Sequence, residues 1–328
     1  MLLCAFAPLR VWDFTMKLFA KYVGSAILLL LVLAALAYSV ARNDLQVLDQ
    51  NARDALGGLY LPTDNGVLSY TRQGSERDPA IILVHGFSTP KFVWDQVTPV
   101  LVNAGYQVIT YDHLGRGFSD RPKGPYNSVL YQRELSSLIQ GLHLSTPLTL
   151  VGYSMGGANV VDYAASHPDQ VKQLILIAPA GYMDSSKLTS ILMSPVVGEW
   201  FTTVFGRQFA YNSIKAEVDA GRAPANMTSD FDAQAIYDGY SNALLSTLRY
   251  FPMADLAHRY RIVAATDIPV TAIWGTEDKI VPYEGAALMA QDIPRLELIT
   301  IDGANHNMTF GQAEVVANAL LKSLHAER

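Results

Sequence analysis

Leu148-Thr149-Leu150-Val151-Gly152-Tyr153-Ser154-Met155-Gly156 is the segment that decides the fold of this 328-residue chain. Its apolar first half predicts a buried strand, and the small residues that follow, 156–161, predict a helix. A serine between two glycines at such a junction lies in a tight, strained turn that exposes its hydroxyl above the sheet. Glycine suits the flanking positions because larger side chains would collide there. We therefore expect Ser154 to be a nucleophile.

Two later apolar runs end in loops that carry the partners such a serine needs. Residues 270–275 predict a strand that is followed by Asp278, and residues 296–301 predict a strand that is followed by His306. The carboxyl ends of parallel strands gather at one edge of a sheet, so the three side chains can meet there. A serine hydroxyl needs a base to remove its proton, and imidazole exchanges protons near neutral pH. Asp278 would orient His306 and stabilise its charged form.

Two backbone N–H groups are the expected donors to the oxyanion that forms when a serine attacks a carbonyl. Met155 directly follows the nucleophile, and Phe87 lies in the loop His85-Gly86-Phe87-Ser88 after the expected strand 80–84. Loss of one such donor typically lowers turnover by about 100-fold or more. The predicted site is therefore Ser154, Asp278 and His306, with the N–H groups of Phe87 and Met155.

From Leu59 onward, the chain resembles serine hydrolases of the α/β-hydrolase fold. Five motifs carry the resemblance: the His85-Gly86-Phe87 loop, residues 112–120, the turn at Ser154, and the loops Gly275-Thr276-Glu277-Asp278 and Gly303-Ala304-Asn305-His306. Within that family it is most similar to membrane-anchored monoacylglycerol lipases and to small bacterial lipases and esterases. The resemblance implies a mostly parallel sheet flanked by helices, a helical cap, and cleavage of lipid-like carboxylic esters through an acyl-enzyme.

The resemblance also implies roles for neighbouring residues. His85 is expected to brace the oxyanion loop, and Asp184 is the position where some relatives carry the acid. Glu277 is expected to point away from the site. Arg116 and Asp120 are expected to brace the floor of the site by ion pairing.

The expected organisation divides the catalytic part into three. Residues 59–180 form the first part of the core, 181–267 a helical cap, and 268–328 the second part of the core. A cap rich in aromatic side chains would shape an apolar acyl pocket, unless those side chains only form the core of the cap itself. They are Trp200, Phe201, Phe205, Phe209, Tyr211, Phe231, Tyr237, Tyr240, Tyr250, Phe251 and Met253.

The N-terminal part predicts a membrane anchor. Residues 22–41 carry no charge and are long enough to span a bilayer. Basic residues precede them in the tail 1–21, which predicts a cytoplasmic tail and an exported catalytic domain joined by the linker 42–58. Two alternatives remain open: Ala35-Leu36-Ala37 resembles a signal-peptidase site, and the segment could be a buried core helix. Met16 also resembles a natural start, which would make residues 1–15 an extension.

The composition of the chain limits the kinds of partner and cofactor that it is expected to bind. The net charge of −6 and the lack of a basic stripe argue against nucleic acid. Cys4 is the only cysteine, so an intrachain disulfide is impossible, and metal-ligand motifs are missing from the sequence. We expect no cofactor and no metal, and the oligomeric state stays open. The competing functions are a carbon–carbon bond hydrolase or a perhydrolase on the same scaffold, and a non-enzymatic binding protein.

Overall fold

The computed structural model describes residues 7–43, 45–183 and 190–325. Asp184, the alternative position for the acid, lies outside the described residues, as do residues 1–6. The chain divides into two compact units, Met1–Leu45 and Gln46–Arg328. Each unit is described by itself.

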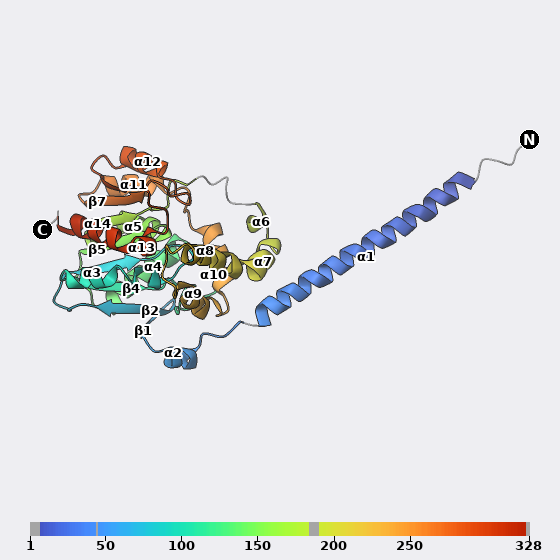
Figure 1. The fold of residues 1–328 in the computed structure, drawn as a ribbon, viewed down its shortest axis with the longest axis horizontal. Helices are drawn as coiled ribbons and strands as arrows, with labels where there is room; N and C mark the ends of the chain where they lie inside the picture. Colours follow the sequence, from blue (N-terminus) through green and yellow to red (C-terminus); the bar gives the residue numbers. More distant parts are fainter. Residues whose placement is uncertain (1–6, 44, 184–189, 326–328) are drawn as a thin grey trace, which may run out of the picture. The chain divides into compact units, whose positions relative to one another are not determined.

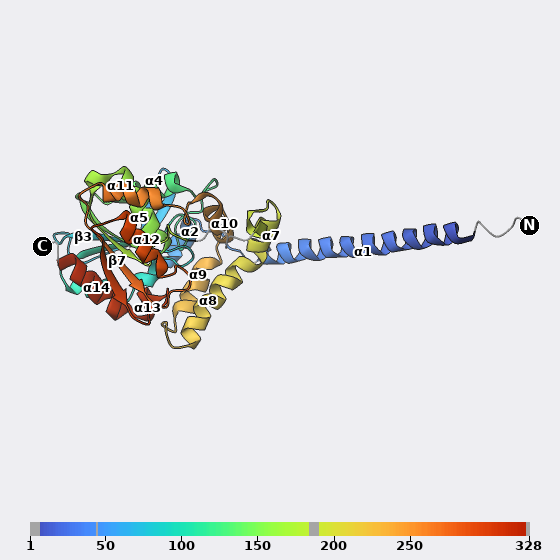
Figure 2. The same ribbon diagram turned by 90° about the horizontal axis from the view of Figure 1, so that it is seen from above.

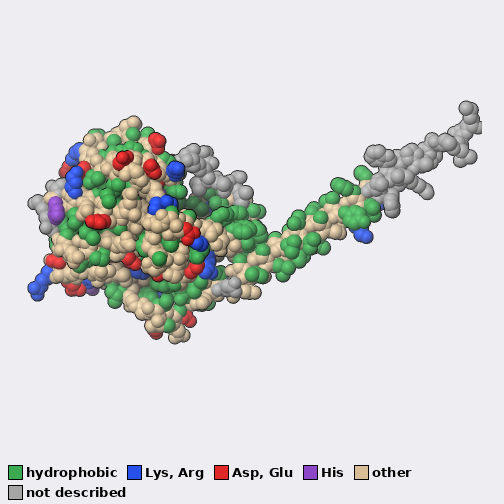
Figure 3. Space-filling model, in the orientation of Figure 1, with side chains coloured by type: hydrophobic (Ala, Val, Ile, Leu, Met, Phe, Trp, Pro, Cys, Tyr) green, Lys and Arg blue, Asp and Glu red, His purple; other side chains and the backbone are tan. Residues whose placement is uncertain are grey.

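The first unit is a single helix, α1 (Ala7–Asn43). Met16–Asn43 is the one stretch in the described part of the chain that is long and apolar enough to cross a bilayer, with 28 residues and a mean hydropathy of 2.4. Figure 3 shows hydrophobic side chains along this helix. The predicted span 22–41 therefore lies within one apolar helix, which continues without a break through Ala35-Leu36-Ala37.

The second unit is built on an eight-stranded sheet (Figure 1). The strand order is β1-β2-β4-β3-β5-β6-β7-β8, and β2 runs antiparallel to both of its neighbours whereas all other pairs are parallel. The predicted α/β class with a mostly parallel sheet is thus confirmed. The strands are β1 (Leu59–Thr63), β2 (Gly66–Gln73), β3 (Ala80–Val84), β4 (Gln107–Tyr111), β5 (Leu148–Tyr153), β6 (Val171–Ile177), β7 (Val270–Gly275) and β8 (Glu297–Ile301).

Helices cover both faces of the sheet (Figure 2). On one face α5 (Met155–Ser166) packs on β5 and β6, between α4 (Ser128–Gly141) and α11 (Ala257–Ala264). On the other face α3 (Thr98–Asn103) packs on β4, and α14 (Ala313–His325) packs on β7. The central strands are apolar on both sides because both sides are covered.

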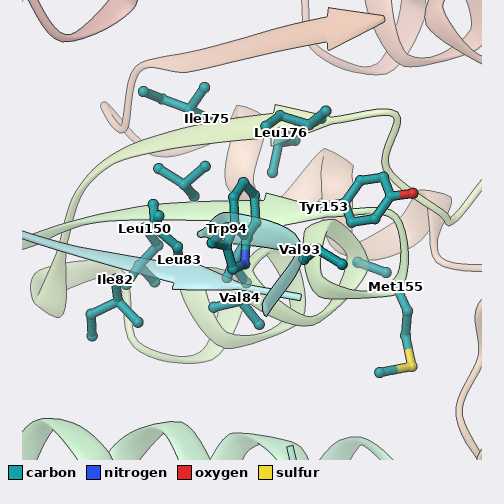
Figure 4. Packing of buried hydrophobic residues seen from close by; sticks show 14 of the residues in the cluster. Ile82, Leu83, Val84, Val93, Trp94, Leu150, Tyr153, Met155, Ile175 and Leu176 are labelled. Atoms are coloured by element: carbon teal, nitrogen blue, oxygen red, sulfur yellow. The ribbon is translucent and has the colours of Figure 1, made fainter. Parts of the chain in front are cut away.

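The core lies around β3, β5 and β6, and Figure 4 shows part of it. Ile82, Leu150 and Ile175 come from these three strands and are fully buried. Trp94, from the short 3-10 helix η1 (Lys91–Trp94), is fully buried against the same cluster. This packing fixes the strand ends that carry the candidate site.

The segment after β3 forms two short helices instead of one. Residues Lys91–Trp94 form η1, and α3 begins only at Thr98. Pro99 lies in the first turn of α3, a position that tolerates proline, whereas proline inside a continuous helix would remove a hydrogen bond. The linker 42–58 contains the helix α2 (Gln50–Leu56), capped by the Asp49 carboxylate, which accepts from the Ala52 N–H at 2.9 Å.

Between β6 and β7 lies the helical insert that the sequence places over 181–267. Its described helices are α6 (Ser190–Met193), α7 (Val197–Phe201), the π-helical turn η4 (Thr202–Gly206), α8 (Arg207–Asp219), α9 (Met227–Ala235) and α10 (Tyr240–Tyr250). The chain does not continue as one helix from α9 into α10. The backbone between them is used elsewhere: Ile236 C=O accepts from the Gln46 N–H at 2.9 Å, and the Asp238 N–H donates to Gln46 C=O at 2.8 Å.

The last helix of this region belongs to the core and not to the cap. Helix α11 packs against α5 and α12 (Glu284–Asp292). The Arg259 guanidinium pairs with Asp162 of α5 at 2.6 Å, and the Tyr260 hydroxyl donates to the Ala180 carbonyl at 2.6 Å. Helix α11 therefore packs on core elements, although it lies within the range 181–267.

Candidate active site

Ser154 lies at the junction of β5 and α5 in a left-handed backbone conformation, with φ +54° and ψ −119°. Its N–H donates to the Ile177 carbonyl at 2.9 Å, and its own carbonyl accepts from the Ala180 N–H at 3.0 Å. A Cβ on Gly156 would lie 2.2 Å from the Val84 carbonyl oxygen, which explains the glycine of the motif. The neighbouring strands therefore hold Ser154 in a strained turn.

Ser154, His306 and Asp278 meet in one hydrogen-bonded chain at the carboxyl edge of the sheet. His306 Nε2 lies 3.0 Å from Ser154 Oγ, and His306 Nδ1 lies 2.7 Å from Asp278 Oδ2. The second Asp278 oxygen accepts from the N–H groups of Ile280 and Val281 at 2.9 and 2.8 Å. The loop thus orients the Asp278 carboxylate through one oxygen, Oδ1, and leaves the other, Oδ2, to accept from the imidazole.

The protonation of His306 follows from its partners. Because a carboxylate only accepts, Nδ1 carries the proton that it donates to Asp278, and neutral Nε2 is free to accept from Ser154 Oγ. Asp278 is buried beside His306, whereas the adjacent Glu277 is exposed to solvent. Asp302 accepts from the Thr276 hydroxyl at 3.1 Å and so fixes the loop before His306.

The two predicted oxyanion donors belong to segments that lie next to Ser154. Met155 is the first residue of α5, where an N–H has no acceptor within the helix. The loop of Phe87 passes close to the serine, since a Cβ on Gly86 would lie 3.3 Å from Ser154 Cβ. His85 Nδ1 donates to the Gly86 carbonyl at 2.8 Å, and this carbonyl shares its peptide group with the Phe87 N–H.

A cavity of about 180 Å³ opens beside Ser154 and His306. Its roof comes from one face of α8, where Ala210, Ser213, Ile214 and Glu217 follow the spacing of successive helical turns. Its walls include Gly86, Phe87, Ser88, Thr89, Tyr153, Ile280, Asn307 and Phe310. The volume equals that of about six waters at roughly 30 Å³ each.

The expectation of an aromatic acyl pocket is wrong for this cavity. Among the described residues, its lining includes none of the aromatic side chains of the insert that the sequence suggests. Trp200, Phe201, Phe205 and Phe209 pack against one another, and Phe209 is 61% exposed. Phe231, Tyr237, Tyr240 and Phe251 are buried. Tyr237 and Phe251 meet the rings of Phe118 and Tyr131, which lie outside the insert. The Tyr240 hydroxyl donates to the Ser88 carbonyl at 2.9 Å.

The comparisons with known proteins agree with this geometry. A family model described as the alpha/beta hydrolase fold matches residues 79–311. The chain belongs to the alpha/beta hydrolase fold family. Lipase 1 of Psychrobacter immobilis is 26% identical over 238 residues, which cover 72% of this chain and 74% of the lipase. The non-heme chloroperoxidase of Streptomyces lividans is 25% identical over 279 residues, which cover 80% of this chain and 98% of that protein.

A solved structure extends the fold match over nearly the whole chain. The crystal structure of a membrane phospholipase A has a TM-score of 0.65 and 21% sequence identity, and the match covers 97% of this hydrolase and 99% of that chain. Relatives with such different names share a scaffold and not one reaction, so the chemistry must be argued from the site.

A buried polar network supports the loop of this hydrolase that carries Phe87. His85 Nε2 accepts from the His113 N–H at 2.9 Å, and His113 Nε2 donates to the His85 carbonyl at 3.2 Å. Burial lowers the pKa of His113 to about 3 and raises the pKa of Glu134 to about 8. The neutral Glu134 carboxyl therefore donates to His113 Nδ1 at 2.5 Å, and its other oxygen accepts from the Leu114 N–H at 2.6 Å.

Glu217 is a site residue that sequence reasoning missed. It is the cap's acidic contribution to the cavity, and its ion pair with Arg222 at 2.8 Å lowers its pKa. Asn305 and Asn307, on either side of His306, lower that pKa further by hydrogen bonding. No motif marks Glu217, and only its place one turn after Ser213 and Ile214 on α8 could have pointed to it.

Of the two residues expected to form ion pairs, Asp120 does so in the structure and Arg116 does not. Asp120 pairs with Arg53 of α2 and accepts from the Val67 N–H at 2.7 Å, so it ties the hairpin β1–β2 to the loop after β4. Within the described part of the chain, no carboxylate forms an ion pair with Arg116. Over residues 7–43, 45–183 and 190–325, no group of three or more His, Cys, Asp or Glu side chains could hold a metal ion.

Proposed function

We propose that this chain is a serine hydrolase that cleaves carboxylic esters through an acyl-enzyme. The observation that supports it most directly is the hydrogen-bonded chain from Ser154 Oγ through His306 to Asp278. An alcohol is a weak nucleophile until a base removes its proton. His306 Nε2 lies 3.0 Å from Ser154 Oγ, which carries that proton. No metal and no organic cofactor enters the proposed reaction.

The reaction proceeds in two halves. Ser154 Oγ attacks the ester carbonyl carbon while His306 Nε2 takes the hydroxyl proton, and the N–H groups of Phe87 and Met155 bind the resulting oxyanion. Collapse breaks the bond to the alcohol, which leaves with the proton from His306, and the acyl group stays on Ser154. Water then gives a proton to His306 and attacks the acyl group, which releases the carboxylic acid and restores the Ser154 hydroxyl.

The substrate class we propose is a lipid-like ester, with monoacylglycerols among the candidates. The name of the relative Lipase 1 supports an acyl ester. The cavity of about 180 Å³ matches a short acyl group, and a longer chain would have to extend beyond it. Chain length is therefore the property that separates a small-ester esterase from a lipase.

A series of acyl esters tests this proposal. Detergent-solubilised protein is given esters from two-carbon to long acyl chains, monoacylglycerols included, alongside Ser154→Ala and Ser88→Ala. Ser88 lines the same cavity but is not part of the hydrogen-bonded chain of Ser154, His306 and Asp278. Ser88→Ala therefore controls for the loss of a hydroxyl in the cavity. We expect Ser154→Ala to abolish hydrolysis while folding normally. Equal activity in Ser154→Ala and the wild type would overturn the proposal.

A perhydrolase is the alternative that one relative supports. The non-heme chloroperoxidase of Streptomyces lividans matches most of this chain, and the same acyl-enzyme attacked by hydrogen peroxide in place of water would give a peracid. Assay of peracid formation from acetate and hydrogen peroxide distinguishes the two. The other alternative is a carbon–carbon bond hydrolase. Such an enzyme would cleave a carbon–carbon bond of a substrate that contains no ester.

We propose that α1 remains attached and anchors the enzyme in a membrane, with the catalytic unit on the exported side. The apolar stretch Met16–Asn43 and the basic Lys17 and Lys21 support this orientation. Mass spectrometry of the protein from membranes tests it: a retained α1 supports the anchor, and a mature chain that begins at Tyr38 means a cleaved signal peptide. The exported side is periplasmic or extracellular, so protease added to spheroplasts, which lack an intact outer envelope, should digest the catalytic unit.

A further inference from the structure

Arg116, in the loop after β4, is fully buried, and its guanidinium faces only neutral acceptors. It donates to the Phe87 carbonyl at 3.0 Å, to the Leu114 carbonyl at 3.3 Å, to the Tyr131 hydroxyl at 2.8 Å and to Thr247 Oγ1 at 2.8 Å. In the described chain it has no carboxylate partner. A buried charge without a counter-ion is costly, so its hydrogen bonds are expected to fix a geometry that the enzyme needs.

The geometry that Arg116 fixes is that of Phe87. Nε donates to the Phe87 carbonyl, and the guanidinium lies over the Phe87 ring, 5.5 Å from its centroid. The residue is thus held at its backbone and at its side chain. The Phe87 N–H, a proposed oxyanion donor, lies on the same residue that Arg116 holds by its carbonyl and its ring.

The same arginine also connects this loop to the cap. Helix α10 places Ala243 and Thr247 one turn apart on one face. Gly115, at φ +86°, lies so close to α10 that a Cβ there would be 2.4 Å from Ala243 Cβ. Thr247 Oγ1 donates to the Ala243 carbonyl at 2.8 Å and accepts from Arg116 and from the Tyr131 hydroxyl, which lies 2.7 Å away.

We propose that Arg116 is a positioning residue that sets the Phe87 N–H for the oxyanion and makes its placement depend on helix α10 through Thr247. The proposal rests on the proposed ester hydrolysis and goes beyond it. It differs from the ion-pairing role expected from the sequence, because Arg116 acts on the oxyanion loop and not on a carboxylate.

The test removes the link to α10 and leaves Arg116 in place. Thr247→Val keeps the side-chain volume but removes the acceptor, and Ser246→Ala is the matched control. Ser246 is the neighbouring residue on α10 and bonds the same loop region, accepting from the Tyr126 N–H at 3.0 Å, without contacting Arg116. The measurements are kcat and KM for 4-nitrophenyl butyrate, the inhibition constant of butylboronic acid, and Tm.

A misplaced oxyanion donor weakens transition-state binding more than substrate binding. For Thr247→Val we expect kcat to fall about tenfold and the inhibition constant of the boronic acid to rise by a similar factor, with KM within about twofold of the wild type. Ser246→Ala should leave all three unchanged. Arg116→Lys, which keeps the charge but not the planar fork, should show the same pattern as Thr247→Val.

A Thr247→Val enzyme with a lower Tm but wild-type kcat and boronic acid affinity would overturn the proposal, because a purely structural role predicts that result. An equal fall in Ser246→Ala would also overturn it, since the effect would then belong to α10 as a whole. A wild-type enzyme that hydrolyses no ester contradicts the proposed function instead, and it is recognised before any variant is made.

Discussion

The Tyr153 hydroxyl donates to the backbone carbonyl of His306 at 3.0 Å, and the two rings lie 5.2 Å apart. The residue directly before Ser154 thus holds the residue that would take its proton. The link joins the end of β5 to the loop after β8, which lie three strands apart in the sheet. One side chain therefore keeps two distant loops of the site in register.

The change Tyr153→Phe removes this link and keeps the ring. We expect a loss of about 1 kcal/mol in the free energy of unfolding and a fall of several-fold in kcat, because the imidazole is less well placed. Urea unfolding and steady-state kinetics on a short ester measure the two effects. A variant that loses stability but keeps wild-type kcat would show that the bond serves the fold alone.

The change Asp278→Asn tests the role of the carboxylate. An amide can still accept from the Ile280 and Val281 N–H groups, but it presents a donor or a neutral oxygen to His306. In serine triads this change lowers kcat by about 10⁴ because the imidazole adopts the wrong tautomer. Asp302→Asn, on the loop before His306, is the control and should retain activity. Comparable activity in the two variants would exclude Asp278 as the acid.

Glu134 predicts a pH dependence of stability. Its pKa is about 8 in the folded protein, against 4.5 in the reference state, because burial disfavours the charged form. Between these values Glu134 keeps a proton in the folded protein that it releases in the unfolded chain, so its contribution to the free energy of unfolding falls as pH rises from about 4.5 to 8. Glu134→Gln keeps both hydrogen bonds, since an amide donates to His113 and accepts from Leu114.

We therefore expect the wild type to lose Tm relative to Glu134→Gln as pH rises through this range. Thermal unfolding of both proteins at pH 5, 7 and 8.5 measures the difference. The exposed Glu314→Gln should follow the wild type at every pH. Parallel curves for the wild type and Glu134→Gln would mean that Glu134 ionises normally.

Ile214 is the residue expected to limit acyl-chain length. It is buried in the roof of the cavity, on the same face of α8 as Ala210. Ile214→Ala removes three carbons and should move the optimum of the ester series to longer chains, at a cost of about 2 kcal/mol in stability. The ratio of kcat/KM for an eight-carbon and a four-carbon ester measures the shift. An unchanged ratio would place the acyl chain elsewhere.

The sequence alone predicts those elements whose signal lies within a short stretch of the chain. The strand before Ser154 and the loops that carry Asp278 and His306 follow from apolar runs that end in polar residues, and the structure brings the three side chains together. Their meeting could be predicted because the parallel sheet places strand ends at one edge. No comparable rule fixes the arrangement of the cap.

The errors lie where tertiary contacts override local pattern. The aromatic residues of the insert looked suited to a pocket, but composition does not say which face of a helix meets Ser154. Glu217 was missed because its role depends on the orientation of α8, and Arg116 was paired with a carboxylate in the prediction although its acceptors are neutral oxygens. The break between α9 and α10 lies at Gly239, whose φ is +95°, and the backbone beside it bonds to Gln46, almost two hundred residues earlier in the chain.

The left-handed backbone of Ser154 implies a trade-off between durability and reactivity. Glycine occupies that conformation without strain, so Ser154→Gly is expected to unfold at a higher temperature than Ser154→Ala. The side chain that suits the turn best is then one that cannot react. Selection for thermal resistance alone would favour an inert protein at this position, and the hydroxyl persists only where its chemistry is in use.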